Sequence, residues 1–211
     1  GENHYIMTTT TGGAANVLGK LEDYLQTEWP ELDVYLTSVT DHFATASLCG
    51  PNSKKILNKI IPDLDLSDDN FPHMSFKEVL IDKIKCRIMR ISFTGELSYE
   101  INAPASYGEA IWQKCIEAGK EFNITPYGTE TMHLLRAEKG FIIVGQDTDG
   151  TMTPIDLQMD WIVSKKKYDF IGKRSLYRSD TMKENRKQLV GLLTEDPNIV
   201  LEEGAQIVSK L

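Results

Sequence analysis

Apolar residues recur at helical spacing in the first half of the chain and alternate with polar residues elsewhere. Helical spacing over residues 13–27 predicts one amphipathic helix, and Gly50-Pro51 opens a second with Ile56, Leu57 and Ile60 on its inner side. Between and after them, alternation and short apolar runs are typical of strands. The predicted strands are Tyr5–Thr9, Asp33–Val39, His42–Leu48, Lys77–Ile81 and Lys85–Phe93.

The last of these strands leads into RISFTGELSYE, residues 90–100, which predicts a β-hairpin. Gly95 supplies the backbone freedom that the turn needs. Glu100 is unexpected in such a hairpin, because it follows an aromatic residue in a strand rich in apolar neighbours. It is an edge charge, an ion-pair partner for Arg90, or an acceptor for a ligand that carries hydrogen-bond donors.

The pattern continues with helices in the middle of the chain and becomes more polar afterwards. A helix is expected from Ser106 to Gly119, and PYGTETMHLLRAEKG, residues 126–140, predicts another that ends at Gly140. FIIVG then indicates a buried strand. Thr153, Pro154 and Asp156 have the order expected at the start of a further helix. Short strands are predicted at Trp161–Ser164, Leu189–Thr194 and Gln206–Lys210.

This order of elements predicts an α+β fold with mixed or antiparallel sheets and packed helices. We expect one domain over residues 1–178, a polar linker over residues 179–188, and the start of a small β-barrel domain over residues 189–211. Two strands are too few to be stable by themselves. The second domain is therefore expected to be truncated.

Composition narrows the classes of function. Acidic residues outnumber basic ones 31 to 23 among 211 residues, a net charge of −8, which disfavours nucleic acid as a partner. No apolar run reaches the length of a membrane helix and no signal peptide is evident, so we expect no membrane association. Three widely spaced cysteines fit reduced thiols in a cytoplasmic protein. The four histidines are scattered and predict no metal site.

Four segments together resemble one family. They are RISFTGELSYE, PYGTETMHLLRAEKGF, VGQDTDGTMTPIDLQMDW and KKKYDFIGKRSL. In this order they resemble the folate-binding fold of the glycine-cleavage T-protein (aminomethyltransferase, GcvT-like) family. Within it they are most similar to the C-terminal part of the α subunit of heterotetrameric sarcosine oxidase. The resemblance covers essentially the whole chain.

The resemblance implies a role for Glu100. A reduced pterin presents a ring N–H and an amino group as parallel donors, and one carboxylate accepts both. In the family the glutamate that ends this hairpin motif does so, and an Arg90–Glu100 surface pair is the alternative. The full set of folate-binding residues that the resemblance implies is Glu100, Arg136, Phe93, Trp161, Tyr99 and Thr10.

Each of the other residues has a structural alternative. Phe93 stands where relatives carry tyrosine and is either a wall of the site or core. Arg136 meets the folate or pairs with Glu138 at a helix end. Trp161 lines the pterin cavity or is core, and the lysines at 165–167 attract a polyglutamate tail or are solvated surface.

The resemblance implies that this chain captures the one-carbon unit of oxidised sarcosine on tetrahydrofolate, giving 5,10-methylenetetrahydrofolate. FAD, FMN and NAD are expected in other parts of the complex, with other sarcosine oxidase subunits as partners. The family's catalytic aspartate is expected upstream of residue 1, so we predict no catalytic residue here and an inactive fragment. The alternatives are a non-catalytic interaction module and a related folate-dependent demethylase or aminomethyltransferase. Departures at Thr10, Phe93 and Met132-His133 favour the module.

Overall fold

The computed structural model describes residues 1–208, and the chain divides into two compact units, Gly1–Lys139 and Gly140–Leu211. The first unit contains all the strands found in the described residues. Its helices and strands are α1 (Ala14–Thr27), β1 (Phe43–Cys49), α2 (Ser53–Ile60), β2 (Phe76–Ile81), β3 (Ile84–Met89), β4 (Ser98–Pro104), α3 (Gly108–Gly119) and α4 (Thr129–Glu138).

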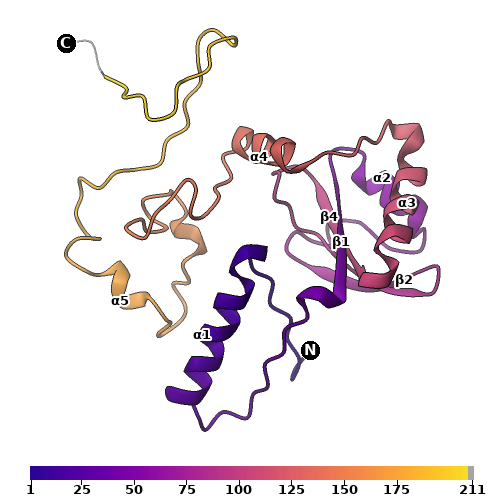
Figure 1. The fold of residues 1–211 in the computed structure, drawn as a ribbon, viewed down its shortest axis with the longest axis horizontal. Coiled ribbons are helices and arrows are strands. Elements are labelled where there is room, and N and C mark those ends of the chain that lie inside the picture. Colours follow the sequence, from indigo (N-terminus) through magenta and orange to yellow (C-terminus); the bar gives the residue numbers. More distant parts are fainter. Residues whose placement is uncertain (209–211) are drawn as a thin grey trace. The chain divides into compact units, whose positions relative to one another are not determined.

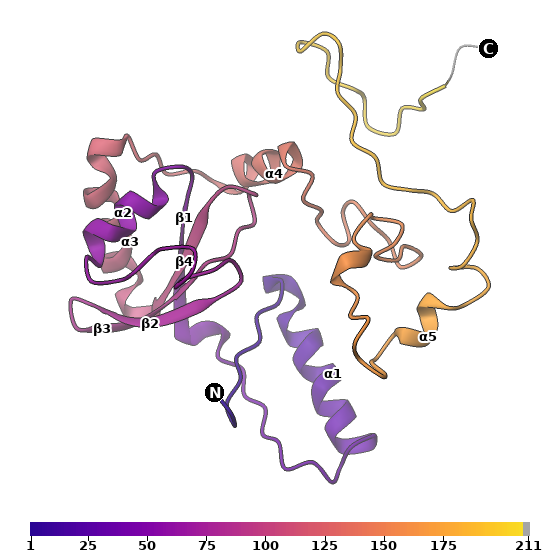
Figure 2. The same cartoon turned by 180° about the vertical axis from the view of Figure 1, so that it is seen from behind.

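The four strands form one antiparallel sheet in the order β1-β4-β3-β2. Helices α2 and α3 pack against each other and against the sheet, and they cover one of its faces (Figure 1, Figure 2). The sequence-predicted α+β class with antiparallel strands is confirmed for this unit.

Alternation along β4 explains how the sheet acquires a core face. Tyr99, Ile101 and Ala103 are buried, and Ile88 of β3 lies beside Ile101 in the ladder. Successive strand residues point to opposite faces, so every second residue of β4 faces the helices. Burying an Ile or Leu side chain contributes roughly 1.5–3 kcal/mol, and helix α2 adds three such residues. They are Ile56, Leu57 and Ile60.

The predicted hairpin is present, with a longer connection than expected. Strands β3 and β4 pair with Met89 opposite Glu100, and residues 90–97 form the loop between them. Gly95 has φ +77°, and a Cβ at this position would lie 2.5 Å from the Cβ of Lys139. Both the backbone conformation and the space at this position therefore require glycine.

Several predicted strands are not formed. Tyr5–Thr9, Asp33–Val39 and Leu189–Thr194 have no strand structure, Trp161–Ser164 falls partly in a 3-10 turn, and FIIVG leads into turns with Val144 exposed. An extended segment becomes a strand only when a neighbour supplies its ladder hydrogen bonds, and none of these segments pairs with one in the structure. The predicted strand Gln206–Lys210 ends outside the described residues. The start of a β-barrel thus stays a prediction.

The second unit contains turns and a short helix, α5 (Lys173–Leu176), with a 3-10 turn at Asp160–Ile162. The helix predicted after Thr153 is not formed, because turns occupy residues 154–158 and Gln158 has φ +57°. The proposed boundaries at residues 178 and 188 stay predictions. No helix within residues 1–208 is both long and apolar enough to cross a bilayer.

Candidate functional site

The sheet face opposite the core of the first unit carries a row of polar side chains. Glu100 lies in β4 between Ser47 of β1 and Met89 of β3, its direct cross-strand partners. Two residues farther along β4, the side-chain oxygen of Asn102 accepts a hydrogen bond of 2.8 Å from the hydroxyl of its cross-strand partner, Thr45. Directly opposite residues in an antiparallel ladder project from the same face. Glu100 therefore belongs to the polar face and lies amid hydroxyl groups.

Glu100 is half-buried, and burial raises the pKa of its carboxyl above the ordinary value of 4.5. Within the described residues its carboxylate makes no hydrogen bond and no ion pair. Desolvation penalises the charged form, and no local donor offsets that penalty. This carboxylate has its full hydrogen-bonding capacity available to a ligand.

The alternative partner of Glu100 is engaged elsewhere. Arg90 donates to the Phe71 carbonyl at 2.6 Å and forms an ion pair with Asp68 at 2.9 Å. Its side chain is 15% exposed, so these two contacts hold a largely buried guanidinium. The alternative that the sequence left open, an Arg90–Glu100 pair, is therefore not formed in the structure.

A tyrosine that the sequence did not single out joins this face. The Cys49 thiol, at the end of β1, donates a hydrogen bond of 3.1 Å to the hydroxyl oxygen of Tyr127. Burial is the largest cause that raises the pKa of Tyr127 to about 12, and the charge of Glu100 also contributes. We call Ser47, Cys49, Glu100 and Tyr127 the polar-face cluster.

Two other predicted site residues also lie in the first unit. Arg136 is buried in the last turn of α4. Phe93 lies in the β3–β4 loop with 40% of its surface exposed, so it is not a core residue. Their contact with folate stays a prediction.

Tyr99 and Thr10 are not brought together with the carboxylate of Glu100. Tyr99 is fully buried on the opposite face of β4, where its ring lies 5.9 Å from that of Phe71. Thr10 is exposed and precedes α1, a helix with no buried residue. Adjacent strand residues face opposite sides of a sheet, so Tyr99 has the position of a core residue.

The remaining predicted residues belong to the second unit. Trp161 is 75% exposed, so it is not a core residue of this unit. Lys165, Lys166 and Lys167 are exposed as well. Their roles in binding stay predictions.

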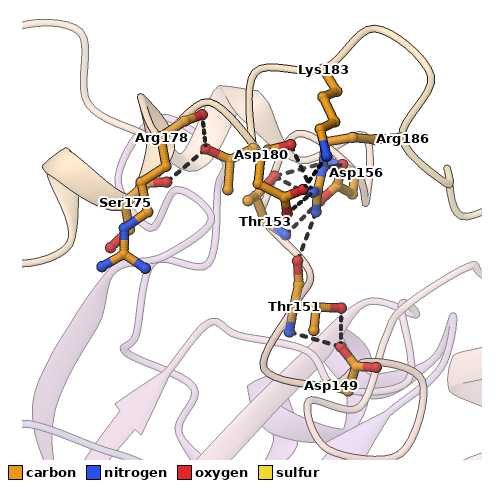
Figure 3. Close-up of polar contacts among 10 residues, drawn as sticks. Asp149, Thr151, Thr153, Asp156, Ser175, Arg178, Asp180, Lys183 and Arg186 are labelled. Atoms are coloured by element: carbon orange, nitrogen blue, oxygen red, sulfur yellow. Dashed lines mark hydrogen bonds and ion pairs between the residues drawn. The ribbon is translucent and has the colours of Figure 1, made fainter.

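The second unit holds a buried ion pair that the sequence did not reveal (Figure 3). Arg186 donates through Nε to one oxygen of Asp156 at 2.8 Å and through Nη2 to the other at 2.6 Å. The Thr153 backbone N–H and hydroxyl donate to the same carboxylate at 2.7 and 2.9 Å. This reproduces the cap expected from Thr153 and Asp156, although no helix follows.

These contacts control the charge of Asp156. The hydrogen bonds from Arg186 are the largest cause that lowers the pKa of the Asp156 carboxyl far below its usual range, against the opposing effect of burial. Arg186 also donates to the Thr151 carbonyl at 2.7 Å. Arg186 lies in the predicted linker, so its side chain ties that segment to residues 151–156.

The described residues contain no group of three His, Cys, Asp or Glu side chains arranged to hold a metal ion. All three cysteines are free thiols. Burial raises the pKa of Cys86, and it raises that of Cys115 to about 11.

Residues 1–167 match the family model described as the GCVT N-terminal domain. The chain belongs to this family. The match includes β4 with Glu100, α4 with Arg136, and the Thr153–Asp156 turn. The resemblance found in the sequence motifs is thereby confirmed.

Individual relatives can be aligned with a longer stretch of this chain than the family model. Sarcosine oxidase subunit alpha of Corynebacterium sp. (strain P-1) is 57% identical over 209 residues, 99% of this chain and 22% of that protein. The protein of the same name from Rhizobium meliloti (strain 1021) is 44% identical over 99% of this chain and 21% of its own length. An aminomethyltransferase of Clostridium botulinum (strain Loch Maree / Type A3) is 34% identical over 80% of this chain and 45% of its own length. The chain thus spans about a fifth of the sarcosine oxidase subunits that it matches.

Proposed function

We propose that this chain is the folate-binding, aminomethyltransferase-like portion of a sarcosine oxidase α subunit, and that Glu100 holds the pterin ring. The observation that carries the proposal is the half-buried Glu100 carboxylate, which has no hydrogen-bond or ion-pair partner among the described residues. Membership in the GCVT N-terminal domain family and the similarity to sarcosine oxidase α subunits support it.

The polar-face cluster fits such a ligand. A carboxylate that has lost water and gained no protein donor favours a ligand with two parallel N–H groups. The hydroxyls of Ser47 and Tyr127 add groups that can donate or accept. The core face beneath the cluster is packed with helices α2 and α3, which gives the strands a rigid support.

Tetrahydrofolate, when bound, supplies the two nitrogens that take up a one-carbon unit, here the unit released from oxidised sarcosine. The residues of this chain contribute binding and orientation. Glu100 accepts the pterin donors and fixes the plane of the ring, and holding a reactant in place is itself a large rate factor. FAD, FMN and NAD, the catalytic aspartate and the partner subunits are proposed to lie outside this chain.

The test is tetrahydrofolate binding by the full-length protein that contains this chain, measured by calorimetry for the wild type and Glu100→Gln. Glutamine keeps the shape but turns an amide N–H₂ toward a pterin donor. Losing a charge-assisted hydrogen bond in a shielded site costs roughly 1.5–3 kcal/mol, so we expect affinity to fall by about ten- to a hundredfold. Asp41→Asn, an exposed carboxylate on the turn before β1, is the matched control and should leave affinity unchanged.

Unchanged affinity in Glu100→Gln would remove Glu100 from the site. Absence of tetrahydrofolate binding by the wild type would instead support the alternative, an interaction module that retains the fold without the ligand. The melting midpoint of each variant, measured in the same samples, separates a binding defect from unfolding.

A further inference from the structure

Tyr127 occupies a defined place on the polar face. Its hydroxyl meets Cys49 at the end of β1, two residues beyond Ser47, which lies directly opposite Glu100. Gly128 follows in an extended conformation, and α4 begins at Thr129. The tyrosine is therefore held between the sheet and the start of a helix, with its polar end toward the cluster.

The hydrogen bond with Cys49 leaves Tyr127 with one direction to donate. A phenol has one O–H donor and can also accept, whereas a thiol is a weak donor. The thiol donates to the phenol oxygen at 3.1 Å, so this contact does not use the phenol's own O–H. A neighbouring ligand would meet Tyr127 as a donor.

Resting on the function proposed above, we propose that Tyr127 donates a hydrogen bond to the ring carbonyl beside the two donors held by Glu100. Tyr127 would then be a specificity-determining residue. It would favour 2-amino-4-oxo pteridines, which present an acceptor at that position, over 2,4-diamino pteridines, which present a donor.

The surroundings support a donor role. Burial is the largest cause that raises the pKa of Tyr127 to about 12, and the charge of Glu100 also raises it. The phenol therefore keeps its proton throughout the neutral range. A 4-amino group would meet this O–H donor to donor, and unmatched polar groups in a shielded site discriminate strongly between ligands.

The experiment compares the affinities of tetrahydrofolate and tetrahydroaminopterin, its 2,4-diamino counterpart, in the full-length protein. For Tyr127→Phe we expect tetrahydrofolate affinity to fall about three- to tenfold, the value of one neutral hydrogen bond. Tetrahydroaminopterin affinity should change less than about twofold. Tyr107→Phe, an exposed tyrosine beyond the other end of β4, is the matched control and should keep the wild-type preference.

Two variants of Cys49 test how the proton of Tyr127 is directed. Cys49→Ala removes the thiol donor, which frees the phenol oxygen to accept from a 4-amino group, so tetrahydroaminopterin should bind more tightly. Cys49→Ser restores a donor at this position and should restore the preference. These variants keep the test decisive if Tyr127→Phe folds poorly.

Each outcome has one meaning. A preference that survives in both Tyr127→Phe and Cys49→Ala overturns the assignment of Tyr127 and leaves Glu100 in place. Equal weakening of both ligands with a lower melting midpoint shows a purely structural tyrosine and also overturns it. If Glu100→Gln binds tetrahydrofolate normally, the proposed function fails and the Tyr127 assignment falls with it.

Discussion

Glu100 in the first unit and Asp156 in the second are both carboxylates at least partly shielded from water. They differ in the hydrogen-bond donors around them and in the direction in which their pKa is changed. Asp156 is 1% exposed, and the Arg186 fork and two groups of Thr153 occupy its oxygens. Glu100 is half-buried, and no donor among the described residues meets it. The pKa of Asp156 is lowered, whereas that of Glu100 is raised.

The difference separates a structural carboxylate from one available to a ligand. Every hydrogen bond that Asp156 accepts ties together segments of its own unit, from Thr153 to Leu189. Glu100 carries the cost of burial without a matching gain in the free protein. A site that is unsatisfied before binding is a candidate for recognition, because the ligand supplies the missing donors.

The largest expected effect on stability comes from Asp156→Asn. An asparagine turns an N–H₂ group toward Arg186 or Thr153 and leaves a buried guanidinium edge without its carboxylate. Losing the charged partner should cost about 2–3 kcal/mol. Hydrogen exchange should report it as faster exchange at the Thr153 and Leu189 amides, which donate to the Asp156 side chain and backbone carbonyl respectively.

Asp180→Asn is the control for this change. Asp180 also contacts Arg186, at 3.3 Å, but its side chain is 69% exposed. Exposed ion pairs contribute little, so exchange at Thr153 should stay as in the wild type. Equal effects of the two variants would show that Asp156 is no more structural than a surface carboxylate.

The two carboxylates should give opposite pH dependence, which is the next effect in size. Glu100 binds its proton more tightly in the folded state. Its contribution is fully present below the ordinary value near 4.5 and is lost as pH rises through the raised pKa. Asp156 contributes above its ordinary value near 3.8, and this contribution is lost as pH falls toward its lowered pKa.

The measurement is the denaturation midpoint of the full-length protein as a function of pH, compared with each single variant. From roughly pH 4 to 7, the range above the ordinary pKa values of carboxyl groups, Glu100→Gln should gain stability relative to the wild type as pH rises. Asp156→Asn should lose stability relative to the wild type as pH rises from strongly acidic conditions. Parallel curves for Glu100→Gln and the wild type would contradict desolvation as the cause of the raised pKa.

Predictions from the sequence were most accurate for the parts of the fold that depend on short-range patterns. The apolar spacing over residues 13–27 gave α1 to within a residue, and the motif around Gly95 gave the β3–β4 hairpin. The predictions failed where a strand needs a distant neighbour. Residues 33–39 have the alternation of a strand, but alternation supplies no ladder hydrogen bonds, and no strand pairs with them in the structure.

The candidate site divides in the same way. Glu100 was found because the hairpin motif contains it. Tyr127 was hidden because its partner Cys49 is 78 residues away, and PYG was interpreted as the start of a helix within a family-like segment. Arg186 was hidden for the same reason, since it lies 30 residues from Asp156 in a stretch whose polarity is typical of a linker. Side-chain pairs separated by that distance leave no periodic signal.

The smallest expected effect tests whether Glu100 is independent of its nearest candidate partner in sequence. Arg90→Gln removes the guanidinium that contacts Phe71 and Asp68. An opposite charge beside a carboxyl lowers its pKa by about 1–3 units, so removing a true partner would raise the pKa of Glu100 by a similar amount. In the structure, burial is the cause that raises the pKa of Glu100, and Arg90 does not contribute to the change. We therefore expect the pKa of the Glu100 carboxyl, followed by ¹³C NMR during a pH titration, to stay nearly unchanged, well short of the roughly 1–3 units that loss of a true partner would give. Some loss of overall stability should accompany the variant, because the Phe71 carbonyl loses its donor. A clear rise in the pKa of Glu100 would restore the ion pair that the structure rejects, and would make Glu100 a structural carboxylate like Asp156.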